Sequence, residues 1–165
     1  MRILYMGSNQ AGVIGLKTLK KLGHDIAAVS AYDKLVETNA AELGLKVLAP
    51  MRNEFFERIP EALDLIVSVN VDDLVPMYIY AMVHYGGITV RPCIYDRKKA
   101  GIIVRRMVKE TAENIISSKV EEGEVLTEIP VDIANAQDNI EKAYSALYPY
   151  YPEALKVVIE KLEEA

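Results

Sequence analysis

Two side chains with contrasting chemistry, Thr89 and Arg91, stand two residues apart in the run Gly86-Gly87-Ile88-Thr89-Val90-Arg91-Pro92. A guanidinium stays protonated at neutral pH, so Arg91 can bind an anion but cannot act as a general acid or base. Thr89 supplies a hydroxyl two residues before it. Such a pair is suited to binding an anion and poorly suited to moving a proton.

Three interpretations of Arg91 remain open at this point. It can be a structural residue at a strand end, paired with Glu121 or Asp96. It can bind an anionic ligand, because a guanidinium matches the geometry of carboxylates and phosphates. It can also stabilise negative charge that develops during a reaction.

A basic cluster follows the same run. Arg97 and Lys98, next to Lys99, are predicted to bind a phosphate or another anion at the start of a helix. Arg105 and Arg106 would extend this cluster along the helix. The alternative is an ordinary solvated loop and helix face.

Other reactive groups are few. Cys93 is the only cysteine, which excludes an intrachain disulfide and a thiolate zinc site, so we expect a small buried thiol. His24 and His84 are the only histidines, and the sequence therefore predicts no transition-metal site. Asp72 and Asp73 are expected either to cap a helix or to bind a ligand amine.

A group of tyrosines near the C-terminus is predicted to pack in the core or at a dimer interface: Tyr144, Tyr148, Tyr150 and Tyr151. Large aromatic side chains are common in both settings. A homodimer is therefore kept as a hypothesis.

The apolar pattern of the first half alternates between strand and helix. Strands are expected at 2–6, 25–30, 46–48, 64–69 and 87–90. Helices are expected from Ser8 or Asn9 to Gly23, over 34–43, over 55–63, and from Pro76 to about 83. This alternation predicts a doubly wound, Rossmann-like α/β fold in which a mostly parallel sheet lies between two helical layers.

The second half carries a different pattern. A helix is expected over 99–109, followed by a hairpin of 115–120 and 124–131 around Glu121-Glu122-Gly123. The end of the chain, 136–164, is predicted to be helical with breaks near Pro149 and Pro152.

Ligands of open α/β sheets bind beyond the carboxyl ends of the strands, where the strand order reverses. Three segments are predicted to meet at that edge: Gly7 to Gly12, Asn70 to Asp73, and Thr89 to Arg97. The spacing of Gly7 and Gly12 does not make a dinucleotide fingerprint.

Composition indicates one globular domain over residues 1–165. The net charge of −5 argues against general nucleic-acid binding. No signal peptide is visible and no apolar run is long enough to span a membrane, so a soluble cytoplasmic protein is expected.

Several motifs, in order along the chain, match one known pattern. Residues 86–97 fit Gly-x-Ile-Asn-x-His-Pro-Ser-Leu-Leu-Pro-Arg at the first Gly, the Ile, the first Pro and the final Arg. Met1 to Gly7, Asp64 to Val67, and Leu74-Val75-Pro76 fit at their places. Glu121 to Leu126 is similar to Asp-Thr-Gly-Asp-Ile-Leu. Together these motifs resemble folate-dependent formyltransferases, in particular the N-terminal catalytic domain of methionyl-tRNA formyltransferases.

The resemblance implies a three-layer formyltransferase fold in which the family's catalytic Asn, His and Asp are replaced by Thr89, Arg91 and Glu121. It implies a small-molecule ligand, 10-formyltetrahydrofolate or another reduced folate, and no metal. The positions expected to bind the ligand are Gly7, Asn9, Asp72, Leu74, Pro76, Arg97 and Lys98. The family's C-terminal tRNA-binding domain is not expected here, which makes tRNA a poor candidate partner.

Two functions from different classes follow from these residues. The chain can be a divergent transferase that binds a folate-like or anionic ligand at the strand ends. It can instead be a non-catalytic protein that retains the fold and binds a ligand or a partner. The loss of the family's His favours the second on chemical grounds, because a positioned acid or base typically contributes about 10²–10⁴ in rate.

Overall fold

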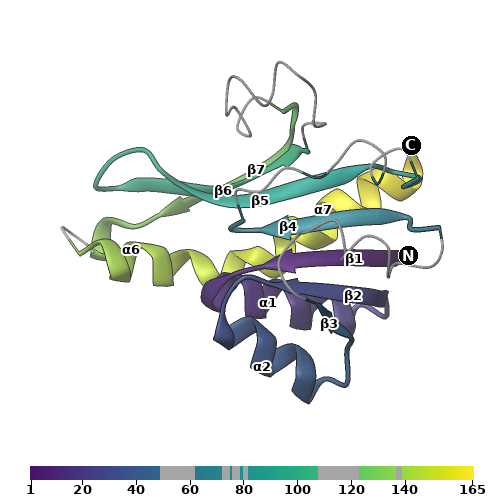
Figure 1. Ribbon diagram of the computed structural model, residues 1–165. Coiled ribbons are helices and arrows are strands. Elements are labelled where there is room, and N and C mark those ends of the chain that lie inside the picture. Colours follow the sequence, from purple (N-terminus) through teal and green to yellow (C-terminus); the bar gives the residue numbers. More distant parts are fainter. Residues whose placement is uncertain (49–61, 72–74, 76–78, 80–81, 108–122, 137–138) are drawn as a thin grey trace.

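Seven strands form one sheet in the order β3-β2-β1-β4-β5-β6-β7 (Figure 1). The structure is a computed structural model that describes residues 1–48, 62–71, 75, 79, 82–107, 123–136 and 139–165. The strands are β1 (Arg2–Gly7), β2 (Asp25–Ala31), β3 (Val47–Leu48), β4 (Leu65–Val69), β5 (Gly87–Ile94), β6 (Lys99–Arg106) and β7 (Val125–Asp132). From β3 to β5 the neighbours are parallel, whereas β6 is antiparallel to both β5 and β7.

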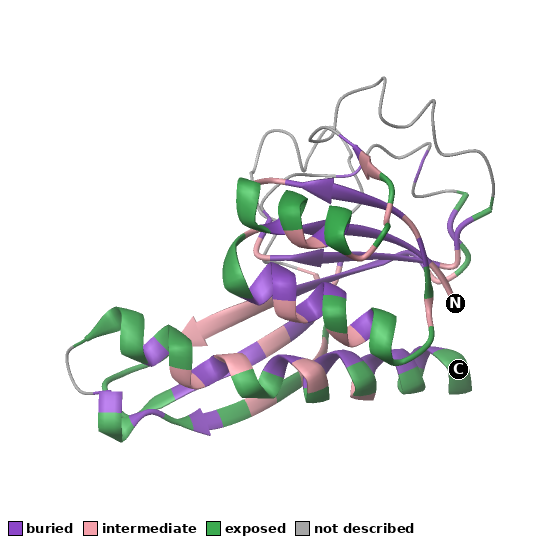
Figure 2. Cartoon of the chain, turned by 90° about the horizontal axis from the view of Figure 1, so that it is seen from below, coloured by how far each residue is buried: buried purple, intermediate pink, exposed green. Residues whose placement is uncertain are grey.

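One face of this sheet is covered by helices. They are α1 (Asn9–Lys21), α2 (Lys34–Glu42), α6 (Ile140–Leu147) and α7 (Tyr151–Glu164), with short 3₁₀ turns η2 (Ala134–Ala136) and η3 (Tyr148–Tyr150). The buried side chains of all four α-helices belong to one core cluster that they share with the sheet. Figure 2 shows the corresponding division of each helix between buried and exposed sides.

The opposite face of the sheet has its own buried cluster. Leu4, Met6 and Ile66 from the strands pack there with other apolar residues, namely Ala28, Leu48, Leu63, Val71, Val75, Ile79, Val83 and Met107.

The helix predicted over 55–63 falls outside the described residues as far as residue 61, and its predicted end is wrong, because Leu63 forms an isolated parallel bridge with Val83. Of the helix predicted from Pro76 to about 83, Ile79 is helical and most other positions lie outside the described residues, while Val83 belongs to that bridge. These two elements are the ones expected to complete the second helical layer.

The predicted α/β fold with a mostly parallel sheet is confirmed. The five strands expected in the first half correspond to β1 to β5, and the expected helices at 8–23 and 34–43 correspond to α1 and α2. Buried apolar runs explain this agreement, because strands covered on both faces read as continuous hydrophobic segments. The predicted C-terminal helical segment is also present, with η3 and α7 beginning near Pro149 and Pro152.

The helix predicted over 99–109 is wrong, since Lys99–Arg106 forms strand β6. Ile102, Ile103 and Val104 are β-branched residues, which favour strands, and Gly101 disfavours a helix interior. A Cβ on Gly101 would lie 2.8 Å from the backbone oxygen of Ile129, so the close approach of β7 also requires glycine. Pairing with the two neighbouring strands, together with these local preferences, therefore stabilises a strand here over the predicted helix.

The hairpin predicted from 115–120 and 124–131 can be compared with the structure only at its second strand. The segment 115–120 lies outside the described residues. The second segment forms β7 as expected, and its observed partner is β6, with Ile102 opposite Ile129. The antiparallel part of the sheet thus consists of β5, β6 and β7 in succession.

A tight turn joins β5 to β6. The Asp96 carboxylate accepts hydrogen bonds from the backbone N–H groups of Lys98 and Lys99, at 2.7 and 2.8 Å. These two bonds lower the pKa of Asp96, and the Lys ammonium groups add a smaller effect in the same direction. Arg97 and Lys98 are exposed residues of this turn, rather than the start of a helix.

Candidate functional site

The carboxyl edge of the parallel strands joins the ends of β1 and β4 through side chains. Ser8 Oγ donates to the Asn70 carbonyl at 2.7 Å, and Asn70 Nδ2 donates to Asn9 Oδ1 at 3.2 Å. Asn9 and Asn70 both have φ 56°, a left-handed conformation that asparagine adopts more readily than most residues. The structure therefore brings together the segments predicted to meet here, Gly7 to Gly12 and the part of Asn70 to Asp73 that it describes.

The N-terminus of α1, a potential anion site in many α/β proteins, is already partnered within the chain. Ser8 N–H donates to the Val69 carbonyl, Asn9 N–H donates to the Asp33 carboxylate, and Ala11 N–H donates to Asn9 Oδ1. The other oxygen of Asp33 caps α2 by accepting from Val36 N–H at 2.9 Å. A carboxylate therefore stands where an anionic ligand would find the first helical N–H groups.

Gly7, a predicted ligand-binding position, is explained by packing. A Cβ at Gly7 would lie 2.7 Å from the Tyr5 ring and 3.3 Å from the Gly12 backbone. Tyr5 is fully buried, and its hydroxyl donates to the Gly12 carbonyl. Burial raises the pKa of Tyr5 well above its ordinary value.

Thr89 and Arg91 lie on the same face of β5, because side chains alternate along a strand. Thr89 is 4% exposed, and its strand neighbours are Ser68 on β4 and Arg105 on β6. Arg91 Nη2 donates to the Val71 carbonyl at 2.8 Å, so the guanidinium holds the backbone that leaves β4. This contact gives Arg91 a structural role whatever else it binds.

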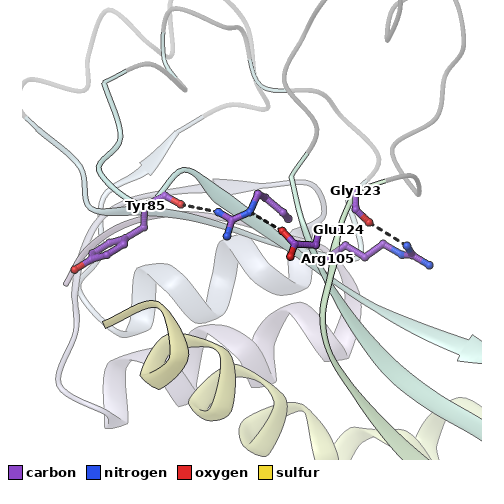
Figure 3. Close-up of polar contacts among 5 residues, drawn as sticks. Tyr85, Arg105, Gly123 and Glu124 are labelled. Atoms are coloured by element: carbon purple, nitrogen blue, oxygen red, sulfur yellow. Dashed lines mark hydrogen bonds and ion pairs between the residues drawn. The ribbon is translucent and has the colours of Figure 1, made fainter. Parts of the chain in front are cut away.

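Glu121, which the resemblance implies is the third catalytic position, falls outside the described residues. Two arginines of β6 contact Gly123 and Glu124, at the start of the next described segment (Figure 3). Arg105 Nη1 donates to the Gly123 carbonyl at 3.1 Å. Arg106 forms a contact of 3.5 Å with the Glu124 carboxylate and donates to the Tyr85 carbonyl at 3.5 Å.

The basic cluster predicted for the loop and helix after Arg97 is divided by the strand. Lys98 and Lys99 stand at the beginning of β6, and Arg105 and Arg106 stand at its end. At about 3.4 Å per residue, roughly 20 Å of strand separates the two pairs. The extension of the cluster to Arg105 and Arg106 along a helix is therefore wrong, whereas ligand binding by Arg97 and Lys98 stays a prediction. Asp72, Leu74 and Pro76, which were also expected to bind ligand, are outside the described residues.

Both histidines of the chain lie at the opposite edge of the sheet, where the parallel strands begin. His24 Nδ1 is 3.1 Å from the N-terminal amine, and partial burial lowers the pKa of His24. His84 N–H donates to the Leu63 carbonyl just before β4, and the His84 ring stacks edge-on against Tyr85. No imidazole is therefore available beside Thr89 and Arg91.

A cavity of about 560 Å³ lies at the carboxyl edge, on the helix-covered face of β5. Its described lining residues come from the network above, from β5 and from the C-terminal helices: Asn9, Asn70, Pro92, Glu141, Tyr144, Ser145, Tyr148 and Tyr151. The volume is within the range of about 300–1,000 Å³ typical of small-molecule sites. We define these residues as the tyrosine pocket.

The sequence prediction placed the pocket tyrosines in a core or a dimer interface. Tyr151 fits the first of these in part, since it is 1% exposed and its ring lies 6.4 Å from that of Tyr148. Burial raises the pKa of Tyr151, and a hydrogen bond with the Asn70 side chain opposes that shift. Tyr144, Tyr148 and Tyr151 are four and three residues apart, which places them on one face of a helix. This spacing is the sequence pattern that could have predicted a shared pocket.

Within the described ranges, no group of three or more His, Cys, Asp or Glu side chains is placed to hold a metal ion. None of the described helices has the length and apolar character needed to cross a membrane.

No family model matches this sequence, and no curated protein matches it. Solved structures do match. The phosphoribosylglycinamide formyltransferase from Streptococcus pneumoniae TIGR4 has a TM-score of 0.69 and 13% identity, and the match covers 98% of this chain and 99% of that one. The formyltetrahydrofolate deformylase from Burkholderia mallei ATCC 23344 has a TM-score of 0.67 and 13% identity, with 96% and 63% covered.

A third structure was determined with ligands. The N-formyltransferase from Helicobacter canadensis, in complex with folinic acid and dTDP-3-aminofucose, has a TM-score of 0.64 and 13% identity, and 98% of this chain and 64% of that one are covered. This chain thus spans under two thirds of two of these three proteins. The chain has the fold of the folate-dependent formyltransferases. These structures come from the deformylase, phosphoribosylglycinamide and sugar branches, rather than the methionyl-tRNA branch that the motifs suggested.

Proposed function

We propose that the chain is a divergent protein of the formyltransferase fold that binds a folate-like or anionic small molecule at the carboxyl edge and does not perform ordinary formyl transfer. The observation that carries this proposal is the distribution of proton-exchanging groups. The sequence resemblance assigns Thr89 and Arg91 to the family's Asn and His positions, and both histidines of the chain lie at the opposite edge of the sheet.

The chemistry of formyl transfer explains why this distribution matters. The attacking amine must lose a proton, and the formyl oxygen must be stabilised as it gains charge. Arg91 can contribute to the second requirement, because a fixed cation stabilises an oxyanion. It cannot contribute to the first, since guanidinium does not release its proton near neutral pH.

Binding is compatible with the same residues. Arg91 is a partly exposed cation beside the ends of β4 and β5, and a guanidinium suits the carboxylates of a reduced folate. The Helicobacter canadensis protein with its bound folinic acid supports folate as the first ligand to test. A small-molecule ligand fits the proposal better than tRNA, given the acidic net charge of the chain.

Two measurements on the whole chain test the proposal. We expect 10-formyltetrahydrofolate to be consumed no faster than in buffer when amine acceptors are present. We expect folinic acid to bind in isothermal titration calorimetry, and Arg91→Ala to weaken that binding at least about tenfold through loss of a charge-assisted contact. Lys20→Ala, which removes an exposed cation from the far end of α1, is the matched control and should leave the affinity unchanged.

Each outcome bears on a different part of the proposal. Turnover that Arg91→Ala abolishes would overturn the claim that the chain lacks formyl transfer. Absence of folinic acid binding, with the wild-type chain folded, would overturn the folate assignment and favour a partner-binding protein that retains the fold.

A further inference from the structure

We propose that a groove between α1 and α7 binds an amphipathic organic anion, a soluble molecule with an apolar body and one carboxylate, sulfonate or phosphate group. The two helices contact each other on the helix-covered face of the sheet (Figure 1). The groove has a volume of about 600 Å³, within the range of about 300–1,000 Å³ typical of small-molecule sites. Its described lining residues, which we define as the lysine groove, are Ile14, Lys17, Thr18, Lys21, Leu22, Pro152, Glu153 and Lys156.

The lysine groove is separate from the carboxyl edge where the folate-like ligand is proposed to bind. None of its described residues lines the tyrosine pocket, and none comes from β4 or β5. Lys17 follows Asn9 by eight residues, which corresponds to roughly 12 Å along α1 at 1.5 Å per residue. Pro152 directly follows Tyr151, but Tyr151 is buried in the core cluster whereas Pro152 is half-buried at the surface. The groove therefore concerns a ligand other than the folate-like molecule.

The charge of the groove is the first argument. Its described lining holds three lysines and one carboxylate, that of Glu153, on a chain whose net charge is −5. Glu153 lies in the first turn of α7, where a carboxylate suits the helix dipole. In the tyrosine pocket, by contrast, Glu141 is the only ionised side chain of the described lining. The lysine groove is thus a local positive region on an acidic protein, and such a region attracts anions.

The second argument is that the lysines have no counter-ion within the chain. Among the residues that the structure describes, the ammonium groups of Lys17, Lys21 and Lys156 form no ion pair or hydrogen bond. Lys17 and Lys21 are four residues apart on α1, where like charges repel each other. The helix dipole accounts for Lys21 in the last turn of α1, but Lys17 and Lys156 are not in the last turn of their helices. An anion bound between these groups would relieve their repulsion.

The apolar part of the groove is the third argument. Leu22 is 42% exposed, and Ile14 and Pro152 are half-buried. The carbon stems of the lysines extend this apolar surface while their charged ends stay in water. Exposed apolar surface with a polar rim is typical of a binding site. An apolar body can therefore lie on these side chains while its anionic group meets the ammonium groups.

A matched pair of fluorescent probes tests the charge preference. The anion is 8-anilinonaphthalene-1-sulfonate, and N-phenyl-1-naphthylamine has the same aromatic body without the sulfonate. We expect fluorescence titration of the whole chain to show the sulfonate binding at least about fivefold more tightly than the amine. Raising NaCl from about 0.02 M to about 0.5 M should weaken binding of the sulfonate and leave that of the amine unchanged, because salt screens exposed charges.

Three variants locate the site. Replacing both Lys17→Gln and Lys21→Gln should weaken sulfonate binding about fivefold and change amine binding less than about twofold. Leu22→Ala should weaken both probes by a similar factor of about two to four, because it removes apolar contact area. Lys20→Gln is the matched control: it removes the same charge from the same helix outside the groove, and should change neither affinity. All four side chains are exposed, so far-UV circular dichroism should show an unchanged fold.

The proposal is overturned if the amine binds as tightly as the sulfonate, or if Lys20→Gln weakens the sulfonate as much as the double substitution does. Sulfonate affinity that falls in Arg91→Ala would assign the probe to the carboxyl edge and also overturn the proposal. A wild-type dimer in sedimentation that Leu22→Ala converts to a monomer would assign the groove to a second copy of the chain instead. Sulfonate binding that persists in Arg91→Ala and falls in the double variant supports the groove, whatever the outcome of the folate experiment.

Discussion

The two faces of strand β5 differ in what their polar side chains contact. On one face Thr89 is buried and Arg91 is fastened to the Val71 carbonyl. On the other, Pro92 borders a cavity of about 560 Å³ in which tyrosines and asparagines line an open space. Thr89 and Arg91 are therefore tied into the chain, while the cavity on the other face is lined, apart from Pro92, by residues outside the 86–97 motif.

This difference shows that the side chains at the motif positions and the binding cavity depend on different contacts. Arg91, which the sequence resemblance places at a family catalytic position, makes a structural contact with the Val71 carbonyl. A cavity between a sheet edge and a C-terminal helix can keep or change its shape independently of that contact. The experiments below probe whether the two faces are as independent as their contacts indicate.

The largest expected effect belongs to the floor of the tyrosine pocket. Tyr151→Ala should lower the free energy of unfolding by about 3–5 kcal/mol, because it removes a fully buried aromatic side chain and leaves a cavity. Urea denaturation followed by far-UV circular dichroism measures this change.

Tyr144→Ala is the matched control for that change. Tyr144 lines the same pocket but is partly exposed, so we expect a loss of less than about 0.5 kcal/mol. Equal losses for the two variants would show that the pocket is not divided into a buried floor and an exposed rim.

A smaller effect is expected on the opposite face. Arg91→Met retains an apolar stem and removes the guanidinium, which leaves the Val71 carbonyl without this donor. The free energy of unfolding should fall by about 2 kcal/mol, the usual range for a hydrogen bond to a charged group. Lys20→Met, at an exposed helical position, should change it by less than about 0.5 kcal/mol. A neutral Arg91→Met would refute the structural role of this side chain.

The smallest effect concerns pH at the far edge of the sheet. Partial burial and the N-terminal amine lower the pKa of His24 below its ordinary 6.5, so the folded state disfavours its protonation. Stability should therefore fall as pH decreases through about 6.5, when the unfolded chain binds the proton first. The difference in unfolding free energy between wild type and His24→Asn, measured from pH 8 to pH 5, isolates this contribution. A wild type that gains stability relative to the variant on acidification would contradict it.

The parallel part of the fold was predictable because its strands are short buried apolar runs. Leu65 to Val69 and Ile3 to Met6 are nearly continuous in apolar residues, and glycines mark the ends of α1 and α2. Strand β6 was not predictable in the same way. Lys99 and Arg105 to Met107 are compatible with a helix, whereas Gly101 and the β-branched Ile102 to Val104 favour a strand, and pairing with β5 and β7 decides between these opposing local preferences.

The candidate site was predictable in part. The meeting of Gly7 to Gly12 with Asn70 follows from the topology of any open parallel sheet. The tyrosine pocket needs contacts between Asn70 and Tyr151, which are far apart in the sequence, and local patterns carry no information on such a pair. The long distance between Lys99 and Arg106 was not predictable either, because the sequence predicted a helix where the structure has an extended strand.

The tight β5–β6 turn has a consequence for the order in which the sheet assembles. Hairpins with short connections form in about 1–10 μs, whereas pairing of strands distant in sequence must first close a long loop. β5 meets β6 across the turn at Asp96, but β1 pairs with β4, with Ile3 opposite Leu65. We therefore expect the strand that carries Arg91 to acquire its antiparallel neighbour early, as a local nucleus onto which the slower parallel pairs add.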